Sequence, residues 1–115
     1  MISFLKKNEQ HQHPNGGGWV ANTATVAASA FVGRYARVHG DARVSGNARV
    51  SGNAWVSGNA RVSGDALVSG NARVYGDARV SGDARVSGDA LVSDNAQVFG
   101  NAWVSGTVNN VVINN

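Results

Sequence analysis

Valine recurs at every sixth position from Val20 to Val104, fifteen times without interruption. Alanine stands four places after each of these valines except the last, from Ala24 to Ala102. An α-helix has about 3.6 residues per turn and would spread a six-residue period around its whole surface. A strand accounts for the pattern, because residues two apart on a strand point to the same face. We therefore predict short strands whose Ala and Val side chains face inward together.

A corner separates successive strands in most repeats. Its residues are Gly-Asn or Gly-Asp, and glycine and Asx residues tolerate the backbone angles of a tight bend. A strand this short cannot bury its valine alone, so successive coils must stack on one another. Three six-residue repeats close one triangular coil, and all fifteen valines and fourteen alanines of the pattern are then predicted to be buried.

This pairing of an aliphatic residue with a small residue four places later resembles the hexapeptide-repeat family, and the resemblance covers Trp19 to Ser105. It implies an all-β fold, a left-handed parallel β-helix of about five triangular coils built from fifteen hexapeptide repeats. The left hand is implied by the resemblance alone, since parallel crossovers generally favour the right hand. We expect residues 1–18 to form an N-terminal cap or arm, residues 19–107 the β-helix, and residues 108–115 a C-terminal cap over the last coil.

The residues that precede the valines form three outward columns, because every third repeat stacks on the same side of the prism. We name these columns the first, second and third faces. The first face reads Trp19, Arg37, Trp55, Arg73, Leu91; the second reads Thr25, Arg43, Arg61, Arg79, Gln97; the third reads Phe31, Arg49, Leu67, Arg85, Trp103. Arginine alternates with large apolar residues on the first and third faces, whereas the second face carries three consecutive arginines.

The alternation has two interpretations. Stacked neighbours lie about 4.8 Å apart, so a guanidinium can lie over the ring of the next coil and stabilise the surface of a single chain. Alternatively, these faces contact another subunit, since Trp, Phe and Arg are enriched at interface cores. Hexapeptide-repeat proteins commonly form trimers, so the resemblance implies a homotrimer through the first and third faces, with Trp55 near the centre and Phe31, Leu67 and Trp103 contributing.

The formal net charge of +3 is unevenly distributed along the chain. Residues 1–62 hold seven Lys and Arg against two acidic residues, a balance of +5, and residues 63–115 hold three arginines against five aspartates, a balance of −2. The basic half favours an anionic partner. The chain has no cysteine and no apolar run near the roughly 20 residues of a membrane span. We expect a soluble, cytoplasmic protein that does not bind membranes.

Several cations of the first two coils have no matching aspartate. Arg34 takes a corner position where glycine is usual, and Tyr35 is next to it. Arg37 and His39 follow on the next predicted strand. These groups are either solvated surface charges or an anion site, in which arginine forks hold phosphate or carboxylate and an aromatic ring stacks on a base. The candidate ligand-binding residues are Arg34, Tyr35, Arg37, His39, Arg43, Arg49, Trp55 and Tyr75.

We do not expect catalysis, a metal or a cofactor. The resemblance implies an acyltransferase as the enzymatic alternative, with a histidine as general base. His39 is the single histidine on the predicted prism, Arg37 would lower its pKa, and only Asp41 is placed to orient it. The gamma-type carbonic anhydrases of the same fold need three histidines on neighbouring coils. His11 and His13 make only a weak metal pair near the N-terminus.

The sequence thus predicts a non-catalytic binding protein, a homotrimer whose grooves sequester a small anion such as a nucleotide, in the manner of phage-encoded nucleotide sponges. The alternative is a purely structural module, a filament or fibre scaffold. Double-stranded DNA is not expected as a partner, because the net charge is low and no element suits a groove of the duplex.

Overall fold

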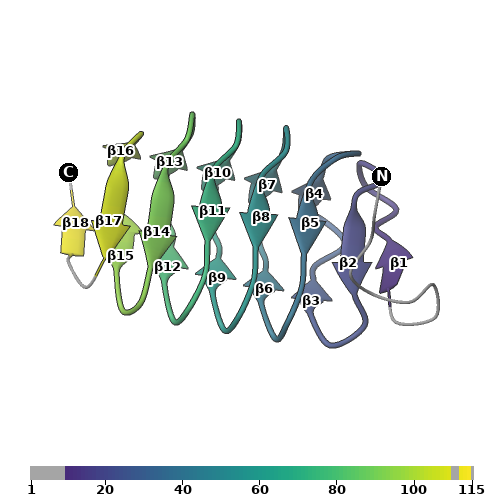
Figure 1. The fold of residues 1–115 in the computed structure, drawn as a ribbon. Coiled ribbons are helices and arrows are strands. Elements are labelled where there is room, and N and C mark those ends of the chain that lie inside the picture. The colour runs from purple at the N-terminus through teal and green to yellow at the C-terminus, as the bar shows by residue number, and fades with distance from the viewer. Residues whose placement is uncertain (1–9, 110–111, 115) are drawn as a thin grey trace.

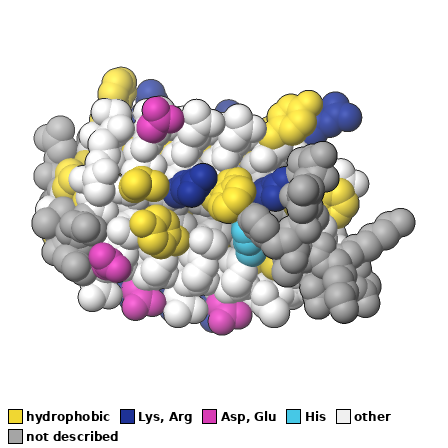
Figure 2. Space-filling model, viewed as in Figure 1, with side chains coloured by type: hydrophobic (Ala, Val, Ile, Leu, Met, Phe, Trp, Pro, Cys, Tyr) yellow, Lys and Arg dark blue, Asp and Glu magenta, His cyan; other side chains and the backbone are white. Residues whose placement is uncertain are grey.

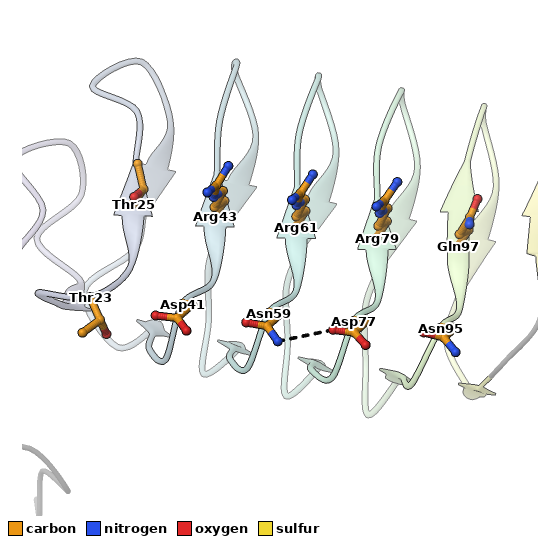
Figure 3. A pocket seen from close by; sticks show the side chains of 10 residues that line it. All are labelled: Thr23, Thr25, Asp41, Arg43, Asn59, Arg61, Asp77, Arg79, Asn95 and Gln97. Carbon is orange, nitrogen blue, oxygen red and sulfur yellow. Dashed lines mark hydrogen bonds between the residues drawn. The ribbon is translucent and has the colours of Figure 1, made fainter.

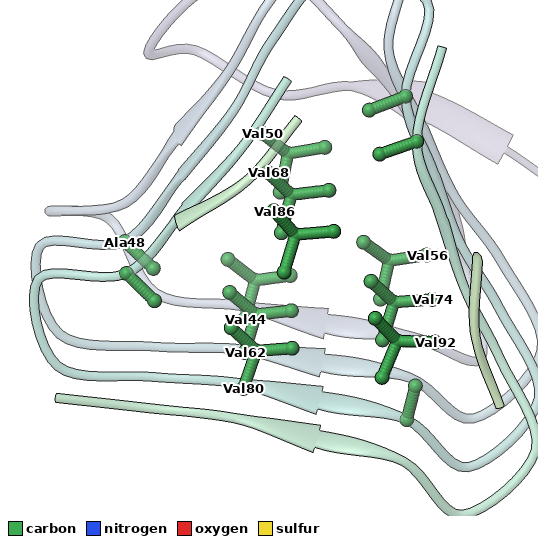
Figure 4. Close-up of a cluster of buried hydrophobic side chains, with 14 of the residues drawn as sticks. Val44, Ala48, Val50, Val56, Val62, Val68, Val74, Val80, Val86 and Val92 are labelled. Atoms are coloured by element: carbon green, nitrogen blue, oxygen red, sulfur yellow. The ribbon is translucent and has the colours of Figure 1, made fainter. Parts of the chain in front are cut away.

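The computed structural model describes residues 10–109 and 112–114. These residues contain eighteen short strands and no helix, and they wind into a parallel β-solenoid of triangular section (Figures 1 and 4). Each strand from β2 to β15 pairs in parallel with the strand three elements later, so three strands make one coil. The all-β fold class and the parallel stacking of about five coils are confirmed; the hand of the coil stays a prediction.

The three faces correspond to three sheets. The first sheet contains β1 (Gln10–Gln12), β2 (Trp19–Ala21), β5 (Arg37–Val38), β8 (Trp55–Val56), β11 (Arg73–Val74), β14 (Leu91–Ser93) and β17 (Thr107–Asn109). The second contains β3 (Thr25–Val26), β6 (Arg43–Val44), β9 (Arg61–Val62), β12 (Arg79–Val80), β15 (Gln97–Phe99) and β18 (Val112–Asn114). The third contains β4 (Phe31–Val32), β7 (Arg49–Val50), β10 (Leu67–Val68), β13 (Arg85–Val86) and β16 (Trp103–Val104). The strand register reproduces all three predicted columns.

The core is a stack of valines and alanines along the axis of the solenoid (Figure 4). Fourteen of the fifteen repeat valines and all fourteen repeat alanines are buried. Val26 is the exception, because it is only partly buried against this core. Its strand, β3, ends the second sheet with no strand beyond it among the described residues. The prediction that every repeat valine is enclosed was therefore wrong at this one position.

The described part of the predicted N-terminal cap covers the ends of the first and third sheets. β1 pairs antiparallel with β2 and ends the first sheet. His13 is buried and its Nε2 donates a hydrogen bond to the carbonyl of Ala30 at 2.7 Å. The N–H of Gly18 donates to the carbonyl of Val32, and the N–H of Val32 donates to the carbonyl of Asn15. These bonds cover the edge of β4, which explains why Val32 is buried although its strand also ends a sheet.

At the other end, two strands continue the solenoid beyond the repeats. β17 pairs in parallel with β14, and β18 pairs in parallel with β15. Val92 lies opposite Val108, two places earlier than the repeat would put the next valine, so the regular spacing breaks after Val104 as predicted. The predicted boundary between the β-helix and the C-terminal cap falls inside β17.

Asparagine and aspartate side chains at the corners form short ladders parallel to the axis. The amide of Asn53 donates to Asn71 at 3.3 Å, and the amide of Asn71 donates to Asp89 at 3.2 Å. On another corner, Asn59 donates to Asp77 at 3.4 Å. These bonds join successive coils in addition to the backbone ladder.

Candidate functional site

Arg34 and Tyr35 form the corner between β4 and β5, where regular repeats carry Gly-Asx. The glycine of the next corner, Gly40, has a φ of 63°, whereas Arg34 does not adopt a positive φ. The first coil therefore turns with a different backbone conformation, which admits residues with long side chains. Both side chains are exposed, and Tyr35 retains 70% of its accessible surface.

A hollow of about 330 Å³ lies beside this corner on the first face. It is lined by Gln12 of β1, Trp19 of β2, the corner residues Arg34, Tyr35 and Asn53, Arg37 of β5 and Trp55 of β8. This described lining offers two guanidinium groups, three aromatic rings and two amides, and it includes no carboxylate. The volume lies at the lower end of the range for small-molecule sites, about 300–1,000 Å³.

The indole of Trp55 is held between two guanidinium groups. The Cζ of Arg37 lies 5.7 Å from the ring centroid, and the Cζ of Arg73 lies 4.9 Å from it. The parallel register produces this stack, because it places the three residues opposite one another on successive strands. Dark blue and yellow side chains accordingly alternate in a row along this face (Figure 2). The predicted stacking of arginine on aromatic rings is confirmed here.

His39 lies against Trp55 and does not line the hollow. The two ring centroids are 5.4 Å apart, and the ring planes are inclined at 53°. Burial, followed by the nearby Arg37 guanidinium, lowers the pKa of His39 below its usual value. The predicted direction of this shift is confirmed, although burial is the larger cause. Because the lowered pKa favours the neutral imidazole near neutral pH, His39 adds no charge to the corner.

Tyr75 occupies a second hollow, of about 280 Å³, further along the first face. Trp55, Ser57, Arg73 and Leu91 complete the lining of that hollow. Trp55 lines both hollows and stands between them, so Tyr75 borders a neighbouring site rather than the groove beside Tyr35. Tyr75 is 40% exposed there.

The remaining two candidate residues lie on other sides of the prism. Arg43 belongs to β6 of the second sheet and lines a different groove. Arg49 belongs to β7 of the third sheet, opposite Phe31 and Leu67. Residues close in sequence therefore separate, because each coil turns through three faces. The structure brings together Arg34, Tyr35, Arg37 and Trp55, with His39 behind them.

Three lining residues were absent from the sequence-based set. Trp19 stands in the same column as Trp55, and Asn53 stands one coil after Tyr35 in the corner column, so the repeat spacing already contained both signals. Gln12 had no such signal. It reaches the hollow through the antiparallel pairing of β1 with β2, which lies outside the repeats.

A comparison with protein families agrees with this architecture. A family model described as "YdcK Beta solenoid repeat" matches eight overlapping segments that together span residues 36–98. The chain belongs to the YdcK β-solenoid repeat family. Comparison with curated proteins and with solved structures gave no match.

The YdcK β-solenoid repeat match begins at residue 36, directly after the corner formed by Arg34 and Tyr35. Arg37, Asn53 and Trp55 lie within the matched repeats, whereas Gln12 and Trp19 precede them. The hollow therefore combines regular repeats with residues that depart from the repeat pattern, and the family match establishes the scaffold only.

No group of three or more His, Asp or Glu side chains converges as a metal site within the part of the chain that the structure describes. In the same residues, no helix is long and apolar enough to cross a membrane.

Proposed function

We propose that this YdcK β-solenoid repeat protein is a non-catalytic binding protein whose first-face corner holds a small anion with a planar ring, such as a nucleotide. The observation that carries the proposal is the convergence of Arg34, Tyr35, Arg37 and Trp55 around one hollow. Arginine forks match the geometry of phosphate and carboxylate oxygens. Aromatic side chains stack on bases, an interaction worth about 1–3 kcal/mol per base.

The electrostatics of the corner support an anion. The described lining carries two arginines and no carboxylate, and the neighbouring His39 is held toward its neutral form. Trp55 is fixed between Arg37 and Arg73, so a ligand that packs against the edge of its ring would order few side chains on binding. Tyr35 is more exposed and supplies a second ring at the rim.

We also propose that copies of the chain associate as a homotrimer through the first and third faces. Trp103 supports this proposal, because it retains 74% of its accessible surface on the third face, over Arg85. Large exposed aromatic rings and arginines are enriched at subunit interfaces. In such a trimer the corner of Arg34 and Tyr35 joins the two contacting faces, so the hollow would border a neighbouring subunit.

Isothermal titration calorimetry with mono-, di- and cyclic nucleotides tests the binding proposal. We expect at least one of these anions to bind wild-type protein with a Kd below about 1 mM, equivalent to about −4.1 kcal/mol. Replacement of Arg34 by alanine should weaken binding about tenfold, since hydrogen bonds to charged groups contribute about 1.5–3 kcal/mol. Arg61→Ala is the matched control, because Arg61 lies on the second face, outside both the hollow and the proposed interface.

Added salt should weaken the same binding, because exposed charges are screened. If no nucleotide binds wild-type protein below this limit, or if Arg34→Ala and Arg61→Ala bind alike, the corner is not an anion site. The interpretation of the chain as a structural scaffold would then replace it.

A further inference from the structure

The second face carries a groove of about 720 Å³ that runs across five coils (Figure 3). Its lining consists only of exposed polar residues: Thr23, Thr25, Asp41, Arg43, Asn59, Arg61, Asp77, Arg79, Asn95 and Gln97. This groove lies on a different sheet from the Tyr35 corner, so an inference about it is independent of the function proposed above.

The groove has two parallel rows of side chains. Arg43, Arg61 and Arg79 come from β6, β9 and β12, which are paired in register, and their side chains lie side by side in Figure 3. The second row comes from the corners that precede these strands. There Asn59 donates to Asp77, which aligns the two side chains along the axis.

The arginine row is an arrangement that the fold itself does not require. Adjacent coils lie about 4.8 Å apart, and like charges at that spacing repel. On the first and third faces an apolar residue separates each arginine from the next, whereas Arg43, Arg61 and Arg79 are consecutive. The inward valines are the same on all three faces, so the core gives no reason for the difference.

The guanidinium groups of this row remain available to a ligand. In the described parts of the chain, no carboxylate lies within ion-pair distance of Arg43, Arg61 or Arg79, although Asp41 and Asp77 line the same groove. The groove therefore presents one cation on each of its three middle coils along one row, with carboxylate and amide oxygens along the other.

We propose that this groove binds an extended acidic polysaccharide, a polyuronate, with one sugar residue opposite each coil. The arginine forks would hold the uronate carboxylates. The oxygens of Asp41, Asn59 and Asp77 would accept hydrogen bonds from sugar hydroxyl groups. A chain with one carboxylate per residue and hydroxyl groups between the carboxylates offers a partner to each of the two rows.

Two other polyanions match the groove less well. Single-stranded nucleic acid binds through aromatic side chains on which bases stack, and none of the residues described in the lining is aromatic. Polyphosphate offers no hydroxyl donors, so the oxygens of Asp41, Asn59 and Asp77 would lose their hydrogen-bond donors on binding it.

Binding of oligomannuronate to the full chain tests the proposal, with the neutral β-1,4-mannan oligomer of the same length as the matched ligand. The mannan differs from the mannuronate only in carrying a hydroxymethyl group in place of each carboxylate. We expect calorimetry to detect the acidic oligomer and not the neutral one. Arg61→Gln should weaken binding about tenfold, because it removes the central charge-assisted contact.

Arg85→Gln is the control variant, since it loses the same charge from an exposed position on the third face. Arg43→Gln provides a second test within the groove if Arg61→Gln does not fold. Equal binding of the neutral oligomer, no binding of either oligomer, or equal loss in Arg61→Gln and Arg85→Gln would overturn the proposal. Tighter binding of polyphosphate or oligothymidylate than of oligomannuronate would overturn it as well.

Discussion

At the scale of single residues, a corner position can require glycine for its backbone conformation or for the close approach of the next coil, and these two requirements are separable in this chain. Gly52 has a φ of 65°, and a Cβ built on it would lie 2.8 Å from the carbonyl oxygen of Gly70 on the next coil. Gly88 has the same φ of 65°, yet a Cβ there would meet no atom within 4 Å. The first position therefore requires glycine for both backbone conformation and stacking, and the second for conformation alone.

Alanine substitutions at these two positions should differ in cost. Gly88→Ala should destabilise the protein by about 1–2 kcal/mol, the penalty for a left-handed residue with a Cβ. Gly52→Ala should cost clearly more, because the neighbouring backbone must also move. Chemical denaturation of both variants measures the difference, and the effect on the unfolded chain is common to both. Equal destabilisation would show that the coils do not approach as closely as the structure has them.

His39 is a second residue whose surroundings set a measurable property. Its pKa is lowered in the folded protein, first by burial and then by Arg37, whereas the unfolded chain keeps an ordinary value of about 6.5. Between the folded and the unfolded pKa, the unfolded chain binds more protons. The free energy of unfolding should therefore fall as the pH drops through about 6.5, and this loss should be complete below the folded pKa.

His39→Gln should remove this part of the pH dependence. We expect the difference in the free energy of unfolding between about pH 7.5 and pH 5 to be smaller in the variant than in wild type. All other residues are the same in the two proteins, so the comparison isolates position 39. A variant with the wild-type pH dependence would contradict the assignment of the shift to His39.

At the scale of elements, each repeat strand has an inward side that packs in the core and an outward side that faces solvent. Val62 points into the core, and the adjacent Arg61 points to solvent on the second face. The inward side is nearly invariant because the triangular core accepts only small and β-branched side chains at close packing. The outward side is free of that constraint, and the three faces differ only there. The chemical differences between the three sides therefore lie in the outward residues and the corners.

Segments outside the repeats lie at both ends of the sheets. Exposed strand edges invite pairing with other chains. The antiparallel strand β1 ends the first sheet, and residues of the following turn cover β4. At the far end, β17 and β18 extend the first and second sheets after the repeat spacing has broken. Edge protection thus comes from irregular segments that flank the repeats.

At the scale of the whole molecule, the solenoid is a prism with chemically distinct sides. The first face carries aromatic rings between arginines, the second carries a polar groove, and the third exposes Trp103 beside Arg85. Each side extends over several coils, so each is large enough for a different partner. A trimer through the first and third faces would leave the groove of the second face open to solvent.

The homotrimer is testable by sedimentation. Trp103→Glu removes a large exposed ring from the proposed interface and puts a charge in its place, so we expect wild type to sediment as a trimer and the variant as a monomer. Gln97→Glu is the control, because Gln97 is an exposed residue on the second face and the change adds the same charge. Circular dichroism should show that both variants keep the β-sheet signal. A monomeric wild type at high concentration, or a trimeric Trp103→Glu, would rule out this assembly.

The six-residue period by itself determined the class of fold, the three faces and the stacking of arginine on tryptophan. This was possible because the inward side of the strand has to be assigned only once. The same assignment then applies to every repeat. The columns through Trp55 and Arg61 follow from counting alone. The lowered pKa of His39 was also predictable in direction, since Arg37 shares its face.

Tertiary structure alone decided what lies outside the repeat. The approach of Gln12 to the Tyr35 corner depends on a hairpin with no period to count, and Val26 is left partly exposed because that hairpin covers the other two sheets. Tyr35 and Tyr75 line separate hollows because the Trp55 ring lies between the two hollows and lines both. A periodic sequence specifies which side chains share a face, whereas the depth and boundaries of each hollow arise from side-chain volumes and from segments that the period does not describe.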